Sequence, residues 1–532
     1  MGEPNSAGLL SPPARALVSA AHAGAAVQVN DRARSERAIL IVIAVGAVAR
    51  LALAASIGLG VDESYAVAVA RPTSLGYYDH PPLVFWITAL IERLGGAHSD
   101  VLLRLPFIVL FAATTWLVAR IARRSFGPRA AVHAAILLQV IPVFGVSDGG
   151  WILPDGPLLL GFALAALALE RATAADGRHG AAWWALAGVG AGIAALSKYH
   201  AIFLISGALL FLATTAGARR WIARPAPYLA GLIALAMSLP VWIWNARHGW
   251  ASFRFQGGRA DLQHGLHIAS LLQNLAGQAG YMLPWIWLAL VWQFVAAVRR
   301  GPGDRPRWLL ACLASGPVIV FPAIALGGRA GLPHWPAPGF LFLVPLLADA
   351  LARLEQRGRA RLVRVYLGGT ALLVVSLVAF AASQIQTGWF SSAFPGLFAH
   401  GDPSLDALDW RELRPVIDSL SAGRTSVVVA SNWIDGAKIG AALAADATVL
   451  CFNDDDRQFH FVADQRALAG RPALIVLRAT PDADRTLARL ASRFAAIDPR
   501  PAARLEIHRH ANDGVGLIVY RARDLFPPTH LP

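Results

Sequence analysis

Pairs of ionisable residues stand where long apolar stretches end in this chain of 532 residues. Asp62 and Glu63 directly follow the apolar run 38–61, and Asp79 and His80 precede two prolines in the segment GYYDHPP. A carboxylate in such a position can remove a proton from an acceptor hydroxyl or amine. Both pairs are therefore candidates for acid–base chemistry.

Basic side chains and a further acid follow the same pattern in other loops. The remaining candidates are Asp155 in SDGGWILPDGP, Lys198 in SKYH, Arg247, His248, Arg254 and Arg259 in the loop 246–268, and His334 in LPHWPAP. A lysine or arginine neutralises a phosphate leaving group, on which negative charge develops as its bond breaks. This set could therefore bind a phosphorylated substrate.

The composition identifies the kind of protein that carries these residues. Hydrophobic residues make up 56% of the chain and charged residues 15%, with a mean hydropathy of +0.50. An average soluble chain is about a quarter charged. These values exclude disordered, collagen-like and disulfide-scaffold proteins and predict a polytopic membrane protein.

Eleven apolar runs are long enough to be considered as membrane spans. They lie near 38–61, 101–119, 130–147, 157–170, 181–197, 199–217, 226–246, 269–297, 308–327, 337–352 and 365–385. A helix that crosses the hydrocarbon needs about 20 residues, so 157–170 and 337–352 are the weakest members. The first run is too long for the core of a signal peptide and has no cleavage site after it. The preceding residues 1–37 are expected to form a disordered cytosolic tail.

The distribution of basic residues predicts the orientation. If the N-terminus is cytosolic, the inner loops hold 18 arginines, whereas the outer loops hold seven basic residues. This excess follows the positive-inside rule and places the C-terminal region 386–532 outside the cytosol. The net charge of +14 then fits contact with anionic lipid headgroups, with no nucleic acid as a partner.

The region 386–532 has a different character from the rest of the chain. The runs TSVVVAS, ATVLCFN, ALIVLRA and GVGLIVY are short and β-branched, and helix-like stretches such as 482–495 separate them. This alternation predicts a small α/β domain. It has no phosphate-binding glycine motif, so we expect it to contribute no chemistry. In all, we expect a mainly α fold of about eleven transmembrane helices with a small C-terminal extracytoplasmic α/β domain.

The first outer loop, 62–100, is the longest candidate for a site. The segment 82–94 is too short to span the bilayer, and its apolar and aromatic face suits a helix lying in the interface. Ionisable groups near a membrane are costly and tend to mark function. All the candidates fall on the outer side, where there is neither ATP nor nucleotide sugar, so an activated donor must be membrane-borne. We therefore expect sugar transfer from a lipid phosphate.

These segments also resemble a known family. Asp62-Glu63, GYYDHPP, PDGPLLL, LSKYHAIFL, WNARHGWASFRFQGGRA and LPHWPAPGFLFL are similar to bacterial family 39 glycosyltransferases of the GT-C fold. That family includes protein mannosyltransferases, lipid A aminoarabinose transferases and rhizobial galacturonosyltransferases. The resemblance covers about residues 38–385 and implies an inverting transfer from a polyprenyl-phosphate sugar at the periplasmic face.

The resemblance also implies roles for single residues. Asp62 takes the position of the base, with Glu63 and Asp79 supporting it, and Lys198 with His80 would hold the donor phosphate. In some relatives the acidic position at 79 helps to bind a divalent metal, which makes Asp79 and His248 candidate ligands here. Aminoarabinose-type members carry an arginine where this chain has Ser64-Tyr65, which speaks against that sugar.

Each candidate also has a structural explanation. Asp62-Glu63 and Asp155 could cap helices, and Lys198 could extend from the interface towards water. Arg50 lies in the middle of the first span, where it must face a partner or a cavity.

Two functions from different classes remain open. The first is a multi-pass glycosyltransferase of the bacterial inner membrane, with a polyprenyl-phosphate-linked sugar donor, membrane lipids and a lipid or glycan acceptor as partners. The second is a transporter or flippase of a lipid-linked sugar, which would favour internal repeats and charges near the midplane. The acceptor could be lipid A, core oligosaccharide, another glycan or a protein.

Overall fold

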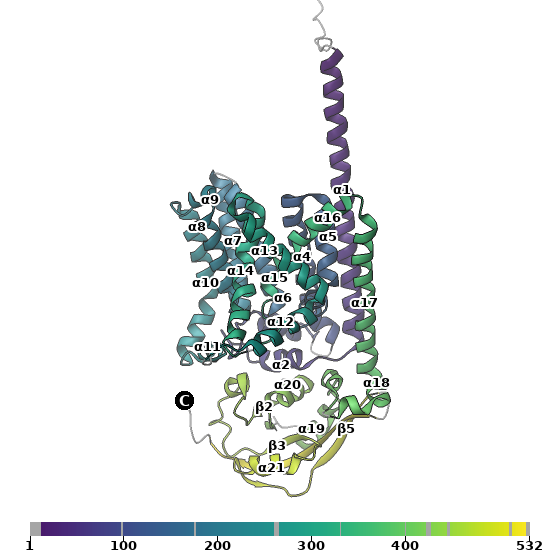
Figure 1. Cartoon of the computed structure of the whole chain (residues 1–532). Coiled ribbons are helices and arrows are strands. Elements are labelled where there is room, and N and C mark those ends of the chain that lie inside the picture. The colour runs from purple at the N-terminus through teal and green to yellow at the C-terminus, as the bar shows by residue number, and fades with distance from the viewer. Residues whose placement is uncertain are drawn as a thin grey trace, which may run out of the picture.

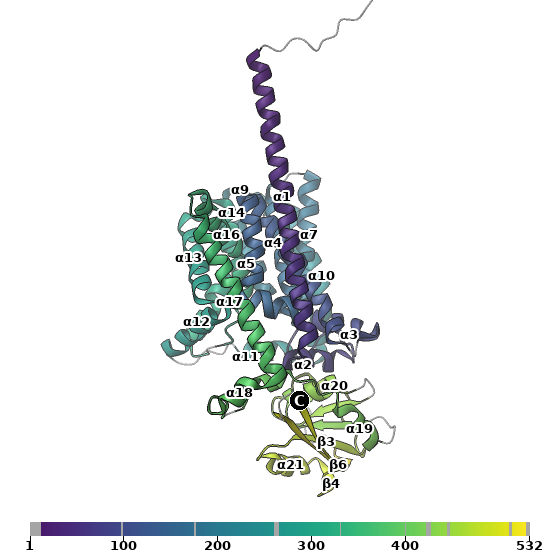
Figure 2. The ribbon, with the colours of Figure 1, turned by 90° about the vertical axis from the view of Figure 1, so that its right-hand side faces the viewer.

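The computed structural model describes most of the chain. The described residues are 12–96, 99–174, 177–259, 265–329, 331–399, 401–421, 427–443, 447–509 and 513–527. Figure 1 shows a bundle of helices with a smaller α/β domain beyond one end, while the first part of α1 projects from the other end. In the perpendicular view of Figure 2 the α/β domain again lies beyond the same end, below α2 and α3.

Helices account for the chain up to the α/β domain. They are α1 (Pro12–Ser56), α2 (Val61–Ala70), α3 (Leu83–Arg93), α4 (Asp100–Phe126), α5 (Pro128–Val140), the π-helix η2 (Val143–Asp148), α6 (Asp155–Ala174), α7 (Gly177–Ser197), α8 (Ala201–Thr214), α9 (Ala216–Arg219), α10 (Pro225–Arg247), α11 (Ala251–Gly258), α12 (Ile268–Met282), α13 (Pro284–Arg300), η3 (Gly301–Gly303), α14 (Arg305–Leu326), α15 (Ala337–Leu341), α16 (Val344–Gln356) and α17 (Ala360–Thr387). The expected mainly α class is confirmed.

The number of spans is smaller than the eleven expected. Among the described residues, eight helices are long and apolar enough to cross a membrane, and a ninth span results if the bent pair α12 and α13 is counted as one. The two weakest runs are among the eight, as Asp155–Ala174 and Ala337–Gln356. The candidate spans among the described residues thus number eight or nine, against about eleven expected, and each of the eleven apolar runs is mainly helical.

Some predicted runs form short or interrupted helices, and each interruption has a physical cause. Helix α5 stops before Pro142, whose missing N–H and ring prevent a regular continuation, and η2 follows. Helix α8 has 14 residues, short of the roughly 20 that span the hydrocarbon. Helices α12 and α13 meet at an angle of 109° between Met282 and Pro284. Hydropathy alone does not reveal these breaks.

The N-terminal segment also differs from the expectation. Helix α1 begins at Pro12 and continues to Ser56, so it includes much of the segment that was expected to form a tail. Its candidate span covers Asp31–Ser56. Within that span Arg50 donates to the Gln139 side-chain oxygen at 2.8 Å, and its guanidinium carbon lies 4.5 Å from the ring centre of Phe111. Arg50 thus has the partner that the sequence left unnamed.

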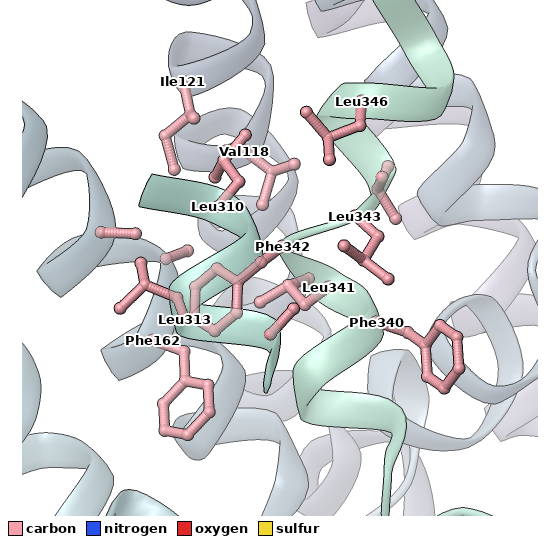
Figure 3. Packing of buried hydrophobic residues seen from close by; sticks show 14 of the residues in the cluster. Val118, Ile121, Phe162, Leu310, Leu313, Phe340, Leu341, Phe342, Leu343 and Leu346 are labelled. Carbon is pink, nitrogen blue, oxygen red and sulfur yellow. The ribbon is translucent and has the colours of Figure 1, made fainter. Parts of the chain in front are cut away.

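The core of the bundle is closely packed apolar side chains. Figure 3 shows residues of α4, α6, α14, α15 and α16 meeting at its centre. The rings of Phe162 and Phe342 stack there with centroids 5.5 Å apart. This core fixes α6, whose first residue is Asp155.

Helices α6 and α7 approach closely because small residues face each other. Gly161 and Ala165 on α6 oppose Gly190 and Ala194 on α7, the small-xxx-small pattern on both helices. A Cβ atom at position 190 would lie 2.7 Å from the backbone nitrogen of Ala165 and 2.8 Å from the carbonyl oxygen of Gly161. This approach sets the separation of the two helices.

The C-terminal domain is a mixed sheet with helices. It contains α18 (Trp389–Ala393), η4 (Pro395–Phe398), η5 (Pro403–Ala407), α19 (Leu413–Ser421), β1 (Val427–Ala430), α20 (Trp433–Ala442), β2 (Thr448–Cys451), η6 (Arg457–Phe461), β3 (Ala473–Arg478), α21 (Ala483–Ala491), β4 (Phe494–Ile497), β5 (Ala503–Arg509) and β6 (Asp513–Leu525). The strand order is β2-β1-β3-β6-β4, and β5 also pairs with β6. Strands β2, β1 and β3 run parallel, whereas β6 runs antiparallel to its neighbours. The four predicted strands and the α/β class are confirmed.

The C-terminal domain is joined tightly to the membrane helices. Helix α20 packs on α2 so closely that a Cβ at Gly440 would lie 2.5 Å from that of Ala68. The buried ammonium of Lys438 donates to the carbonyl oxygens of Leu59 at 2.7 Å and Leu408 at 2.6 Å. One buried apolar cluster includes residues of α2, α3, α20 and the sheet. The two parts therefore form one packed structure.

We predict that Gly190→Ala destabilises the protein, because its methyl group meets backbone atoms that cannot move aside. Overpacking of this kind costs about 1–3 kcal/mol, so the melting temperature of the detergent-solubilised protein should fall by several degrees. The matched control is Gly368→Ala in α17, where nothing lies within 4 Å of the added Cβ. Equal melting temperatures for the two variants would contradict the close packing of α6 on α7.

Candidate active site

A cavity with a volume of about 420 Å³ lies at the end of the bundle that faces the C-terminal domain. Ten acidic or basic side chains line it: Asp62, Asp79, His80, Asp148, Asp155, Lys198, His200, Arg259, His334 and Arg457. They come from the ends of helices and from the loops between them. Seven of the eleven predicted site residues are thus brought to one cavity.

Asp62 is the second residue of α2, the helix that follows the first span. Its side chain is exposed and opens into the cavity. Desolvation by the protein around the cavity raises the pKa of Asp62 above its ordinary value, while the charges of Arg457 and Lys198 oppose the rise. A carboxylate with a raised pKa is a stronger base in its ionised form.

Glu63 has a different environment and does not line the cavity. Arg104 donates to its two carboxylate oxygens at 2.7 and 2.6 Å. The backbone N–H groups of Gly60 and Ile152 donate to the same carboxylate at 2.9 and 3.2 Å. The four hydrogen bonds leave little capacity for a substrate. The expected support of catalysis by Glu63 is therefore corrected to a structural role.

Arg104 also fixes the turn between α1 and α2. Its guanidinium donates to the carbonyl oxygens of Ala54, Ile57 and Gly58 at 3.2, 3.0 and 2.8 Å. The last carbonyls of a helix have no hydrogen-bond donors within the helix, and here Arg104 supplies the missing donors. Because this turn leads directly into α2, Arg104 determines where Asp62 lies.

Asp155 and Lys198 form a buried ion pair in the cavity wall. Asp155 is the first residue of α6, and Lys198 directly follows α7. The Lys198 ammonium donates to both oxygens of Asp155 at 2.9 Å. The close packing of α6 on α7 brings them together. The sequence placed both at the site but did not predict that they pair.

Asp79 lies in the loop between α2 and α3, and its side chain is 2% exposed. The Tyr65 hydroxyl donates to Asp79 Oδ1 at 3.0 Å, and the Gln256 amide donates to the Asp79 carbonyl oxygen at 2.6 Å. Burial raises the pKa of this carboxyl group. Asp79 therefore joins α2 to α11 in the cavity wall.

Three histidines in the cavity wall are electrically neutral near pH 7. Burial, with a further contribution from the charge of Lys198, lowers the pKa of His80 to about 3 and that of His334 to about 4. The same two causes lower the pKa of His200 well below its ordinary value. These side chains can exchange hydrogen bonds with a substrate, but they do not supply positive charge. A cationic role for His80 at the phosphate does not fit this environment.

The loop after α10 contributes only one of its four predicted residues. Arg259 lines the cavity, with its guanidinium carbon 4.2 Å from the ring centre of Phe255. Arg247 and Arg254 are exposed and are not among the lining residues. His248 stacks on Trp244 at 4.2 Å, also outside the lining. These three residues do not line the cavity, and their role in substrate binding stays a prediction.

The residues present do not fit the divalent metal that the family resemblance raised. Within the described part of the chain, no group of three or more His, Cys, Asp or Glu side chains is arranged to hold a metal ion. Asp79 already accepts from Tyr65, and the Nδ1 atom of His248 lies 2.7 Å from the Trp244 carbonyl oxygen. No step of the proposed chemistry uses a metal.

The C-terminal domain contributes two lining residues that the sequence did not predict. Trp433 is the first residue of α20, and Arg457 is the first residue of η6. The domain was expected to contribute no chemistry, whereas two of its residues line the cavity. The run NDDDRQFHF follows the carboxyl end of a parallel strand, the usual side for ligands in such sheets, and this could have drawn attention to Arg457.

Comparisons with known proteins support the family resemblance. Residues 79–244 match the family described as dolichyl-phosphate-mannose-protein mannosyltransferase. The chain is 25% identical over 285 residues to the lipid A galacturonosyltransferase RgtD of Rhizobium johnstonii, which covers 53% of this chain and 58% of that protein. The match thus spans little more than half of the length of the curated relative. The predicted resemblance is confirmed.

The fold resembles solved structures over nearly the whole chain. The ArnT protein of Cupriavidus metallidurans bound to undecaprenyl phosphate superposes with a TM-score of 0.60 at 17% identity, covering 90% of this chain and 97% of that one. Its apo structure gives the same TM-score at 16% identity. The chain is therefore a multi-pass membrane protein with an ArnT-like GT-C fold.

We predict that Glu63→Gln destabilises the fold much more than Asp62→Asn does. The side chains of Arg104 and Glu63 are 2% and 3% exposed, and breaking a buried ion pair leaves an uncompensated charge at a cost of about 3–5 kcal/mol. Thermal unfolding of the two solubilised variants measures the difference. Wild-type stability of Glu63→Gln would show that the pair does not hold the turn.

Proposed function

We propose that this protein is an inverting glycosyltransferase that moves a sugar from a polyprenyl-phosphate donor to an envelope acceptor, with lipid A as the favoured class. One observation carries the proposal. Lys198 and Tyr199 line both the charged cavity and a second, apolar groove. A lipid tail in the groove would bring its phosphate end to the cavity that contains Asp62.

The groove has an apolar lining that suits part of an isoprenoid chain. It lies between α7, α8 and α10, with a volume of about 510 Å³. Apart from Lys198, Tyr199 and Ser238, its lining is apolar or aromatic, including Trp184, Trp242 and several leucines. A hydrocarbon chain placed there is removed from water, which is favourable in proportion to the area buried.

The charged groups can then perform an in-line transfer. The acceptor oxygen attacks the anomeric carbon while the bond from that carbon to the phosphate oxygen breaks. Asp62 takes the proton of the acceptor, and polyprenyl phosphate leaves with the bonding electrons. Cations in the cavity stabilise the negative charge that develops on the phosphate. Lys198 is one of these cations, with its ammonium held in place by Asp155.

The relatives support the substrate classes. RgtD is described as a lipid A galacturonosyltransferase, and one ArnT structure contains undecaprenyl phosphate. The excess of arginine in alternate loops supports a cytosolic N-terminus, with the cavity and the C-terminal domain on the periplasmic side of the inner membrane. On that side a membrane-borne donor is the available activated sugar.

We predict that Asp62→Asn removes transfer while leaving the fold intact. Loss of a general base costs about 10²–10⁴-fold in rate, and the amide has nearly the same shape as the carboxylate. Transfer of labelled sugar from polyprenyl-phosphate donors to lipid A is measured in detergent, where transport across a membrane plays no part. Comparison of envelope glycolipids by mass spectrometry, with and without the gene, identifies the sugar and its carrier.

The matched control is Asp418→Asn, an exposed carboxylate on α19 in the C-terminal domain. Its transfer rate should equal that of the wild type. Retention of transfer by Asp62→Asn would exclude the base role. A wild-type protein that transfers no sugar from any polyprenyl-phosphate donor would refute the function itself.

The pH profile of transfer should have its acid limb above the range of an ordinary aspartate. A base works only when ionised, so the rate falls as the pH drops through the pKa of Asp62, which desolvation raises above its usual value near 3.8. His80 and His334, with pKa values of about 3 and about 4, add no break near neutrality. The measurement is the single-turnover rate of sugar transfer as a function of pH. An acid limb below pH 4 would contradict a raised pKa of Asp62.

A further inference from the structure

The C-terminal domain forms one wall of the cavity. Trp433 and Arg457 of this domain line the same space as Asp62. The guanidinium carbon of Arg457 lies 3.5 Å from the ring centre of Trp433 and 5.9 Å from that of Tyr65. Contacts of this kind between a cation and aromatic rings fix the position of the charge. A cation from outside the membrane helices therefore faces the carboxylate of Asp62.

Hydrogen bonds made by the next residue hold η6 against the membrane helices. The Gln458 backbone N–H donates to the Tyr65 hydroxyl at 3.1 Å, and the Tyr78 backbone N–H donates to Gln458 Oε1 at 2.8 Å. The Tyr65 hydroxyl in turn donates to Asp79. A buried polar network in which the members satisfy one another is rigid. Arg457 is thus held at the cavity and does not sit on a free loop.

The backbone at Arg457 is strained. Its φ is 48°, in the left-handed region that a side chain with a Cβ atom rarely adopts. Such strain persists only where the surrounding structure enforces it, and it is concentrated at functional sites. Here it occurs at the residue of η6 whose cation reaches the cavity. The packing around η6 therefore supports this orientation at an energetic cost.

The charge of Arg457 is only loosely compensated. Its nearest carboxylate oxygens belong to Asp455 at 3.6 Å and Asp79 at 3.9 Å, both beyond hydrogen-bond distance. Its Nε atom is buried and has no hydrogen-bond partner among the described residues. Lys198, in contrast, is bound to both oxygens of Asp155. A buried donor without a partner is costly unless a ligand satisfies it.

We propose that Arg457 binds the phosphate oxyanion of the lipid-linked donor, which makes the C-terminal domain part of the transferase site. This inference rests on the proposed function. Arginine presents several N–H groups in a planar fork that matches phosphate oxygens. Arg259, which directly follows α11, lines the same cavity and can contact the same anion. The phosphate then lies between two arginines from different domains.

The test compares full-length variants in detergent for their affinity for undecaprenyl phosphate, which carries the phosphate but no sugar. Arg457→Gln should weaken binding by about tenfold or more, because charged hydrogen bonds are lost. Arg457→Lys keeps the charge without the fork and should lie between Arg457→Gln and the wild type. The control Arg485→Gln removes an arginine that is 85% exposed in the same domain and should bind as the wild type does.

Each outcome decides between the assignments. Equal affinity of the wild type, Arg457→Gln and Arg457→Lys would overturn the role of Arg457 and leave the proposed function standing. Failure of the wild type to bind undecaprenyl phosphate would overturn both. Unchanged affinity with a raised KM for the sugar-linked donor would place Arg457 at the sugar and overturn its assignment to the phosphate. If Arg457→Gln does not fold, weaker binding by the folded Arg457→Lys supports the phosphate contact and equal binding refutes it.

Discussion

The buried pair of Glu63 and Arg104 is the interaction on which the site depends. A charge buried among helices is tolerated only when it is paired and hydrogen-bonded, and this pair meets that condition through the turn between α1 and α2. Glu63 faces inward to Arg104, whereas its neighbour Asp62 opens into the cavity. Neighbouring residues on a helix point about 100° apart, so fixing one fixes the other.

The same turn connects the membrane helices to the C-terminal domain. Lys438 of α20 donates to the carbonyl of Leu59, one residue before the cap of α2, and α20 packs on α2 through Gly440 and Ala68. The helix that carries Asp62 is therefore held both by Arg104 of α4 and by the C-terminal domain. A movement of the domain would displace Arg457 and Asp62 together, which links the geometry of the phosphate contact to that of the base.

The sequence predicted the fold class and many of the residues that line the cavity, and the exceptions have physical reasons. Hydropathy identified the helices but not the break at Pro142 or the bend before Pro284, which depend on local backbone geometry. Residue type and loop position identified Asp62 and Lys198 as members of the site. The same reasoning could not separate Asp62 from Glu63, because their partners lie on other helices. Arg457 was missed since only tertiary packing brings its domain to the cavity.

The distribution of charge favours transfer over transport. A pathway through the bundle would need ionisable groups at several depths. The acidic and basic residues that line the cavity all lie at helix ends or in the adjoining loops, at the end of the bundle nearest the C-terminal domain. Arg50, in the middle of α1, is instead engaged by Gln139 and Phe111. These contacts account for the position of Arg50 without a role in substrate binding. Among the described residues, the charged side chains that can meet a substrate gather in the cavity at one end of the bundle, beside the apolar groove.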